Sequence, residues 1–356
     1  MDPAALRAQF PILAQLAYLN AGTDGPVPHA SHELVARELA SELEEGRGVA
    51  HFERRFALQD ELRAGYAELL ACAPADVALT TSTSEGLGKV LAGMELGPGD
   101  EIVTSDEEHP GLIGPLIAAR ERGVAIRAVP FTELADAVGP RTTAVACSHV
   151  GWRSGLLAPE ALADVSVPVI LDGAQGIGAV PVDVAKLRCA AYAGAGQKWL
   201  CGADGTGMLY LAPDFRERVR AIAPAYTAFE DVSRGFESPL KPDVRRHDTP
   251  SLAREVLAFS VAALGVLRDA DLSAVLARGP VLAANLAERL TARGATVAPR
   301  DHTTLVSWED ADPTASKARL AGAGVMVRDL PGTPLLRASV GAWTNEDDLE
   351  RLLAAV

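Results

Sequence analysis

The chain has 356 residues, enough for two domains with a large buried core, and its 48% hydrophobic and 22% charged residues are typical of a globular protein. Lysine plus arginine number 33 against 47 aspartates plus glutamates, and the formal charge of −14 argues against nucleic acid or an anionic membrane as a partner. The four cysteines show no C-x-x-C spacing, so we expect neither a disulfide framework nor a metal site.

The amino-terminal region shows no targeting pattern and is expected to contribute a loop to a site. Residues 1–4 lack a basic segment followed by an apolar core, and the most apolar stretch, 256–267, is too short to span a bilayer. We therefore expect a cytoplasmic protein. The Pro- and Gly-rich stretch 18–28 predicts a loop that lines a site, and His29 and His32 are expected on the solvated face of a helix.

Short apolar runs alternate with helical patterns from about residue 55 onward. This alternation predicts an α/β fold in which a mostly parallel sheet lies between helices. The predicted strands are 76–80, 101–104, 124–129, 143–149, 167–171 and 206–211, and the predicted helices are 56–71, 84–94 and 110–122. Ligands of such sheets bind at the carboxyl ends of the strands, where Thr83, His109, His149 and Asp172 are expected to meet.

A second region begins after Thr249-Pro250. Its pattern predicts a helix over 251–268, further helix over 273–293 with a break near Gly279-Pro280, and a terminal helix from Asn345. Two short strands are predicted at 303–308 and 335–340. We therefore expect a large α/β domain over residues 15–250, and a small α+β domain over 251–356 that includes residues 1–14.

Lys198 and Asp172 form the most informative pair of residues in the chain. Lys198 follows a Gly/Ala-rich stretch, about 25 residues after Asp172-Gly173-Ala174-Gln175 ends an apolar run. A partly desolvated lysine loses its proton more readily than a reference lysine, and the neutral amine can form a Schiff base. A buried aspartate can hold a pyridine nitrogen protonated, as pyridoxal phosphate (PLP) requires. Taken singly, each could equally be a surface lysine or a loop aspartate.

Two further motifs suit an anionic ligand and one suits a flat ring. The segment 80–86 joins a strand to a helix and predicts a phosphate cradle, although Thr83 or Ser84 could also simply cap the helix. Arg328 and Arg337 flank a Pro/Gly loop, and a guanidinium fork suits a substrate carboxylate. His109 could lie on a planar cofactor and assist proton transfer, or it could cap a helix.

The order of these parts, from Tyr18-Leu19-Asn20-Ala21-Gly22 to Leu336-Arg337-Ala338-Ser339, resembles the class V, fold-type I PLP enzymes. This superfamily includes cysteine desulfurases, cyst(e)ine C–S lyases and isopenicillin N epimerase-like proteins. The resemblance implies a seven-stranded sheet, PLP as cofactor, an amino-acid substrate and a homodimer with its sites at the subunit interface.

The resemblance also implies a role for individual residues. Lys198 would carry the Schiff base, Asp172 would hold the pyridine nitrogen, and His109 would stack on the ring. The remaining cofactor contacts would be Gln175 at the ring hydroxyl, Thr83, Ser84 and Gln197 at the phosphate, and Thr249 at the phosphate of the neighbouring subunit. The expected substrate-binding residues are Arg337, Arg328, Asn20 and Trp152. The superfamily usually has His directly before the lysine and Ser or Thr two residues earlier, whereas this chain has Gln197, which can donate a hydrogen bond, and Ala195, which cannot.

Within the superfamily, Glu108-His109-Pro110-Gly111 and Ser148-His149-Val150-Gly151-Trp152 look most like the cyst(e)ine C–S lyases. A desulfurase needs a mobile cysteine in the loop that here spans 329–334, and this chain has no cysteine after Cys201. The resemblance therefore implies a β-eliminating lyase that cleaves the C–S bond of cysteine, cystine or a related sulfur amino acid. The alternatives are aminotransferase, desulfurase-like or epimerase chemistry on an α-amino acid, and a catalytically silent PLP-fold binding protein.

Overall fold

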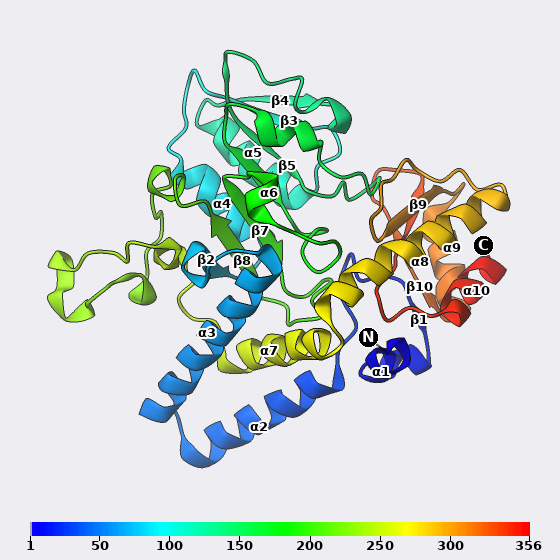
Figure 1. The fold of residues 1–356 in the computed structure, drawn as a ribbon, viewed down its shortest axis with the longest axis horizontal. Coiled ribbons are helices and arrows are strands. Elements are labelled where there is room, and N and C mark those ends of the chain that lie inside the picture. Colours follow the sequence, from blue (N-terminus) through cyan, green and yellow to red (C-terminus); the bar gives the residue numbers. More distant parts are fainter. Residues whose placement is uncertain (1) are drawn as a thin grey trace.

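A seven-stranded sheet forms the centre of the larger part of the molecule, for which the computed structural model describes residues 2–356 (Figure 1). The strand order is β2-β8-β7-β6-β5-β3-β4, and β8 alone runs antiparallel to its neighbours. The strands are β2 (Val77–Thr80), β3 (Glu101–Ser105), β4 (Ala125–Val129), β5 (Thr142–Ser148), β6 (Val169–Asp172), β7 (Ala191–Ala195) and β8 (Gly207–Leu211). The mostly parallel seven-stranded α/β fold expected from the sequence is confirmed.

Helices cover both faces of this sheet, because successive strand residues enter different cores. On β5, Ala144 and Ala146 pack in the core formed with α4 (Thr83–Gly93) and α5 (Pro110–Glu121). Val145 and Cys147 pack in the core on the other face, formed with α3 (Val49–Leu70) and α7 (Arg254–Asp269). The shorter helix α6 (Val184–Leu187) precedes β7.

Strand β7 leads directly to Lys198, and the sequence did not predict it as a strand. All five of its residues are buried, and most are glycine or alanine. Small residues are required because α4 lies directly against the strand: a Cβ at Gly86 of α4 would lie 2.9 Å from the Cβ of Ala193. Burial on both faces thus replaces the branched side chains that usually indicate a strand.

The carboxy-terminal region contains a three-stranded antiparallel sheet packed with helices. Its strands, in sheet order, are β11 (Arg328–Asp329), β12 (Leu335–Ser339) and β9 (Leu305–Glu309), and its helices are α8 (Leu272–Ala292), α9 (Pro313–Gly322) and α10 (Glu346–Ala355). Helix α8 runs unbroken, so the break expected near Gly279-Pro280 is wrong. Both residues are buried, and a proline removes only one hydrogen bond from a helix that tertiary packing holds in place.

The amino-terminal segment lies beside this carboxy-terminal region (Figure 1). Strand β1 (Ala17–Tyr18) pairs in parallel with β10 (Val325–Met326), and α1 (Pro3–Ala8) is held by an ion pair of 2.6 Å between Arg7 and Asp348. The grouping of residues 1–14 with the second domain and the boundary at residue 250 both stay predictions.

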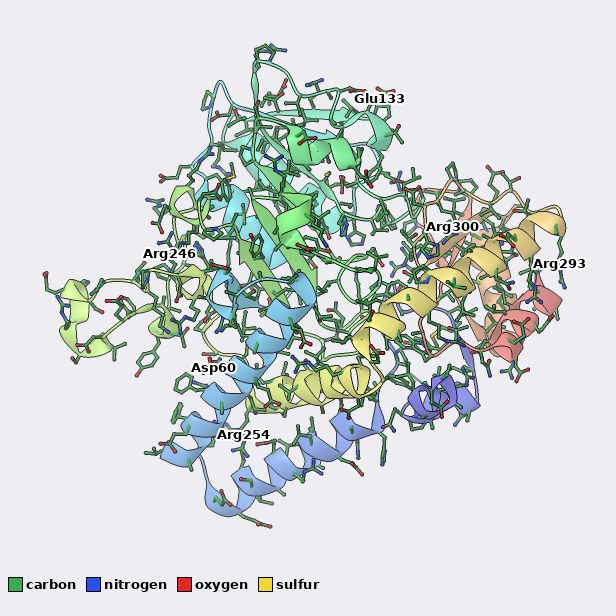
Figure 2. All side chains as sticks on the ribbon, in the orientation of Figure 1. Asp60, Glu133, Arg246, Arg254, Arg293 and Arg300 are labelled. Carbon is green, nitrogen blue, oxygen red and sulfur yellow. The ribbon has the colours of Figure 1, made fainter. Side chains whose placement is uncertain are left out.

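The long helix α2 (His29–Glu45) lies along α7 at the lower edge of the molecule (Figure 1). Arg254 of α7, labelled in Figure 2, forms a buried ion pair of 2.5 Å with Glu38 of α2. His29 and His32 are exposed on α2, as the sequence predicted. Within residues 2–356, none of the helices combines the length and apolarity needed to cross a bilayer.

Candidate active site

The backbone around Lys198 is fixed by a tight turn and by the loop 18–28. The turn closes with a hydrogen bond of 3.1 Å from the Cys201 N–H to the Lys198 carbonyl, and Cys201 takes a left-handed φ of 54°. From the other side, the Gly25 N–H donates to the Gln197 carbonyl at 2.8 Å. A Cβ at Gly25 would lie 2.2 Å from the Lys198 carbonyl oxygen, so only glycine allows this approach.

Lys198 and Asp172 have the electrostatic properties of a reactive amine and its counter-charge. Burial lowers the pKa of Lys198 to about 8, against the opposing effect of Asp172. Its side chain nevertheless keeps intermediate solvent exposure. Asp172, the last residue of β6, is 5% exposed and accepts one hydrogen bond, from the Ala174 N–H at 2.9 Å. Burial raises the pKa of Asp172, while Ala174 and Lys198 lower it. A cationic ligand nitrogen would complete the surroundings of this carboxylate.

The amino-terminal ends of α4 and α5 lie close together. Ser82, rather than Thr83 or Ser84, is the capping residue of α4, since its hydroxyl accepts from the Glu85 N–H at 3.1 Å. Thr83 Oγ1 is buried without a hydrogen-bond partner. Ser84 is exposed, and a Cβ at Gly111 on α5 would lie 2.6 Å from its Oγ. The first N–H groups of a helix lack carbonyl partners within it, so this end of α4 offers several donors to an anion.

His109 is the capping residue of α5 and is held as a neutral ring. Its Nδ1 accepts from the Gly111 N–H at 3.0 Å, so the ring proton is on Nε2. Burial, followed by the charges of Lys198 and Arg337, lowers the pKa of His109 to about 4. The ring meets Trp152 edge-on, with centroids 5.1 Å apart. His109 can therefore offer an Nε2–H donor to a ligand, whereas Nδ1 is not free to act as a base.

Gln175 is fixed at both ends of its amide. Its Nε2 donates to the Gly22 carbonyl at 2.8 Å, and its Oε1 accepts from Trp199 Nε1 at 3.0 Å. The second N–H of the amide is left for a ligand. The amide joins the loop 18–28 to the residue that follows Lys198.

Arg337 is a buried cation without a carboxylate partner in residues 2–356. Its side chain is 2% exposed, Nη1 donates to the Trp152 carbonyl at 2.8 Å, and Nε has no partner. Arg337 of β12 lies directly opposite Arg328 of β11 in the antiparallel pairing. Burial, and then the charge of Arg328, lowers the pKa of Arg337 to about 9. Like charges opposite each other destabilise a sheet, so this arrangement indicates an anion-binding role.

Asn20 and Thr23 connect the amino-terminal loop to this arginine pair. Asn20 forms a β-bridge with Ser339, the last residue of β12, and its Oδ1 accepts from Thr23 Oγ1 at 2.9 Å. Thr23 Oγ1 in turn accepts from Arg328 at 3.1 Å. The structure thus brings Asn20, Arg328, Arg337 and Trp152 together, and their roles in substrate binding stay predictions.

Thr249 contacts side chains of α4, whereas the amide oxygen of Gln197 is buried without a partner. The Thr249 hydroxyl donates to Glu85 at 2.5 Å and accepts from Lys89 at 3.0 Å, both on α4 of the same chain. A contact to the phosphate of a neighbouring subunit would require this hydroxyl to be shared, and that role stays a prediction. Gln197 Oε1 is buried and unpartnered, so its amide is available to the site. Ala195 is buried within β7 and offers no donor.

One expected member of the site faces elsewhere, and one unexpected residue lies near it. His149 follows β5, but its Nδ1 lies 3.0 Å from the hydroxyl of Tyr192 in the interior. Asp24, which the sequence analysis passed over, lies in the loop 18–28 and acts electrostatically on Lys198. The loop was expected to line a site, yet a single aspartate in a loop gives no sequence signal of its own.

The sequence profile of the aminotransferase class-V family matches residues 24–352. The chain belongs to this family. Isopenicillin N epimerase of Streptomyces clavuligerus is 27% identical over 95% of this chain and 93% of its own, and cysteine desulfurase CsdA of Escherichia coli is 28% identical over 100% and 97%. A lysine-to-alanine mutant of C-DES, with glycine covalently linked to the PLP cofactor, superposes with a TM-score of 0.91 at 25% identity over 98% of both chains. The cystine C–S lyase C-DES with its product cysteine persulfide gives 0.88 at 25% identity, over 97% of this chain and 98% of that one.

Membership of this family makes the protein a PLP-dependent enzyme, and the residues present fit that cofactor. The unpartnered Thr83 Oγ1 and the free N–H groups of α4 suit a phosphate and would replace the hydroxyl that Ala195 lacks. The sparsely bonded carboxylate of Asp172 suits a protonated pyridine nitrogen. The lowered pKa of Lys198 suits an amine that must lose its proton to react.

Proposed function

We propose that this enzyme is a β-eliminating lyase that cleaves the C–S bond of cysteine, cystine or a related sulfur amino acid. The observation that carries the proposal is the short hairpin between Arg328 and Arg337. It is closed by a hydrogen bond of 2.9 Å from the Leu330 N–H to the Leu335 carbonyl, and it contains no cysteine. A desulfurase needs a mobile cysteine in this segment to accept sulfur. The likeness to a cystine C–S lyase supports the same choice.

The two arginines would determine where the amino acid binds. Arg337 is rigidly held by the Trp152 carbonyl, and its free donors can pair with a substrate carboxylate in place of the missing protein partner. Arg328, fixed through Thr23, would add the second contact. An α-carboxylate at this point brings Cα toward Lys198, whose charge acts together with that of Arg337 on His109.

The chemistry would depend on proton movement at Lys198 Nζ. PLP, when bound, supplies the electron sink that makes loss of the Cα proton and of the sulfur substituent possible. Lys198 Nζ takes the proton from Cα, and the Cβ–S bond then breaks with its electron pair leaving on sulfur. After hydrolysis the products are pyruvate, ammonia and a thiol, or a persulfide when the substrate is a disulfide. Asp172 and Thr83 would hold the ring nitrogen and the phosphate.

Other outcomes on the same cofactor begin with the same proton and differ in its destination. The likeness to isopenicillin N epimerase favours epimerisation as the second candidate. The discriminating experiment incubates the PLP-loaded enzyme with L-cystine, L-cysteine and ordinary amino acids, without a keto acid, and follows pyruvate and the chirality of the remaining substrate. Pyruvate from the sulfur amino acids alone supports the lyase. Racemisation without pyruvate would identify the enzyme as an epimerase instead. Turnover only with an added keto acid would identify it as an aminotransferase.

We further propose a cytoplasmic homodimer. The support is an arm, residues 222–240, that projects from the body of the molecule at the left of Figure 1. The arm exposes large apolar side chains, of which Phe236 is fully exposed; the others include Ile222, Tyr226 and Val232. A monomer rarely exposes such a group of large apolar side chains, so we infer that a second copy of the chain packs against the arm. All four cysteines are free thiols, which agrees with a reducing compartment.

A further inference from the structure

Asp24 is held between the residues that are proposed to bind the carboxylate and the reactive lysine. Its preceding residue, Thr23, accepts a hydrogen bond of 3.1 Å from Arg328. Its following residue, Gly25, packs on the Lys198 carbonyl, and the Gly25 N–H donates to Gln197. The Asp24 carbonyl accepts from the hydroxyl of Tyr18 at 2.9 Å. The backbone of Asp24 is therefore fixed on both sides at the edge of the site.

The carboxylate of Asp24 has no protein partner of its own. It is exposed, and within residues 2–356 it takes part in no hydrogen bond or ion pair. Partial burial and the nearby charge of Asp204 raise the pKa of Asp24, while Lys198 and Arg328 lower it. The charges that act on this carboxylate thus come from the site and from one further carboxylate at its edge.

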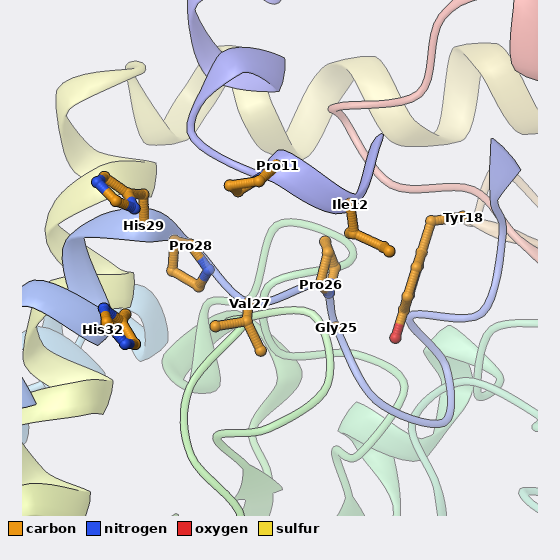
Figure 3. Close-up of a pocket in the computed structure, with 9 residues that line it drawn as sticks. All are labelled: Pro11, Ile12, Tyr18, Gly25, Pro26, Val27, Pro28, His29 and His32. Atoms are coloured by element: carbon orange, nitrogen blue, oxygen red, sulfur yellow. The ribbon is translucent and has the colours of Figure 1, made fainter. Parts of the chain in front are cut away.

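The hollow beside this loop supplies neither a lysine nor an arginine to pair with Asp24. This hollow has a volume of about 510 Å³ and is lined mainly by Pro11, Ile12, Tyr18, Pro26 and Val27, with His29 and His32 on the side away from Tyr18 (Figure 3). Figure 3 shows the Tyr18 ring beside Gly25 and Pro26, with its hydroxyl directed toward the loop. Neither Lys198 nor Arg328 is hydrogen-bonded to the Asp24 carboxylate, so it is open to a cationic group of a ligand in the site.

We propose that Asp24 is a specificity-determining residue that binds the distal ammonium group of a substrate whose sulfur joins two amine-bearing halves. This inference rests on the proposed function. One half of such a substrate would place its carboxylate on Arg337 and its Cβ–S bond near Lys198. The other half would bring its ammonium to Asp24, and carboxylates pair well with ammonium groups through charged hydrogen bonds. Cysteine has no second ammonium, so Asp24 selects cystine-like disulfides and thioethers over free cysteine.

Two mixed disulfides test the contact between Asp24 and a distal ammonium group separately from contacts to a distal carboxylate. The disulfide of L-cysteine with cysteamine keeps the distal ammonium and lacks the distal carboxylate, and the disulfide with 3-mercaptopropionate has the reverse. The wild-type enzyme is expected to show a kcat/KM about fivefold higher for the first, the size of effect that a half-exposed ion pair produces. Asp24→Asn should remove this preference and Asp24→Glu should retain part of it. Asp136→Asn, which neutralises an exposed carboxylate in the segment after β4, should leave it unchanged.

A binding measurement gives a readout that is independent of turnover. Calorimetric titration of the two disulfides into Lys198→Ala protein should show the same preference, and Asp24→Asn in that background should remove it. A preference that survives Asp24→Asn, or that follows Asp204→Asn instead, overturns the role of Asp24 while the lyase function stands. If the wild-type enzyme cleaves neither disulfide nor cysteine, the proposed function fails, and this inference fails with it.

Discussion

At the scale of single residues, the site is defined by charges that the protein leaves uncompensated. Arg337 is buried without a carboxylate, while Arg254 is equally buried but is paired with Glu38. A buried charge without a partner lowers stability, and such a cost persists where the charge is needed for binding. The two arginines therefore offer a direct comparison between a functional and a structural cation.

Arg337→Met should separate activity from stability. We expect KM for the amino acid to rise at least about tenfold, because the carboxylate loses a bidentate partner. The free energy of unfolding of the substrate-free protein should change by less than about 1 kcal/mol, since one hydrogen bond to Trp152 is lost and an unpaired buried charge is removed. Arg254→Met should instead cost about 1.5–3 kcal/mol, because the buried Glu38 loses its hydrogen bonds to Arg254 and keeps only Arg54 as an ionic partner. Steady-state kinetics and urea unfolding measure both, and a large loss of stability in Arg337→Met would contradict this account.

The lowered pKa of Lys198 predicts a specific pH dependence of stability. Burial moves the folded-state pKa from 10.5 to about 8, so between these values the unfolded chain binds more protons than the folded protein. The free energy of unfolding of the cofactor-free protein should therefore rise as pH increases through this window. The Lys198→Met variant lacks the titrating group, so its free energy of unfolding should rise less over the same pH range. If the free energies of unfolding of the two proteins changed in parallel from pH 8 to 10.5, burial would not be destabilising the charged form of Lys198.

At the scale of elements, helix α4 positions the proposed phosphate cradle by packing closely on β7. Two glycines of α4 differ in what surrounds them: a Cβ at Gly86 would lie 2.9 Å from Ala193, whereas a Cβ at Gly88 would meet nothing within 4 Å. The close packing at Gly86 fixes where the first turn of the helix, with Thr83, is held. The open position at Gly88 has no such role.

Gly88→Ala should stabilise the protein by about 0.5–1 kcal/mol, because alanine has the higher helix propensity and no contact opposes it. Gly86→Ala should destabilise it by about 1–3 kcal/mol and weaken PLP binding, because the helix must move away from β7. Thermal unfolding and fluorescence titration with PLP measure the two effects. If the two variants had equal stability and bound PLP equally well, the contact with β7 would not position the phosphate cradle.

Sequence patterns predicted the elements with ordinary periodicity and failed where packing replaces it. Strands β3 and β5 alternate or run apolar in the usual way and were predicted within a residue or two. Strand β7 was missed because its glycines and alanines reflect contact with α4, which only the fold reveals. Lys198 and Asp172 could be found from their motifs, whereas Asp24 could not, because its importance comes from neighbours distant in sequence.

At the scale of the whole molecule, the exposed arm is the feature that a single chain leaves unexplained. Phe236→Asp is expected to weaken self-association, because it places a charge in the apolar surface of the arm. Val281→Asp alters an exposed apolar residue on α8, outside the arm, and should have no such effect. Sedimentation velocity over a range of concentrations measures the change. A wild-type protein that remains monomeric at all concentrations would contradict the proposed dimer.

The central claim is that Lys198 removes the Cα proton of a sulfur amino acid and that the C–S bond then breaks. Its most direct test follows pyruvate release from L-cystine by the PLP-loaded enzyme and by Lys198→Ala, with no keto acid present. We expect one pyruvate for each persulfide formed by the wild-type enzyme, and none above background from Lys198→Ala. Pyruvate release at the wild-type rate by Lys198→Ala would contradict the assignment of Lys198, and a wild-type enzyme that releases no pyruvate from any sulfur amino acid would contradict the lyase itself.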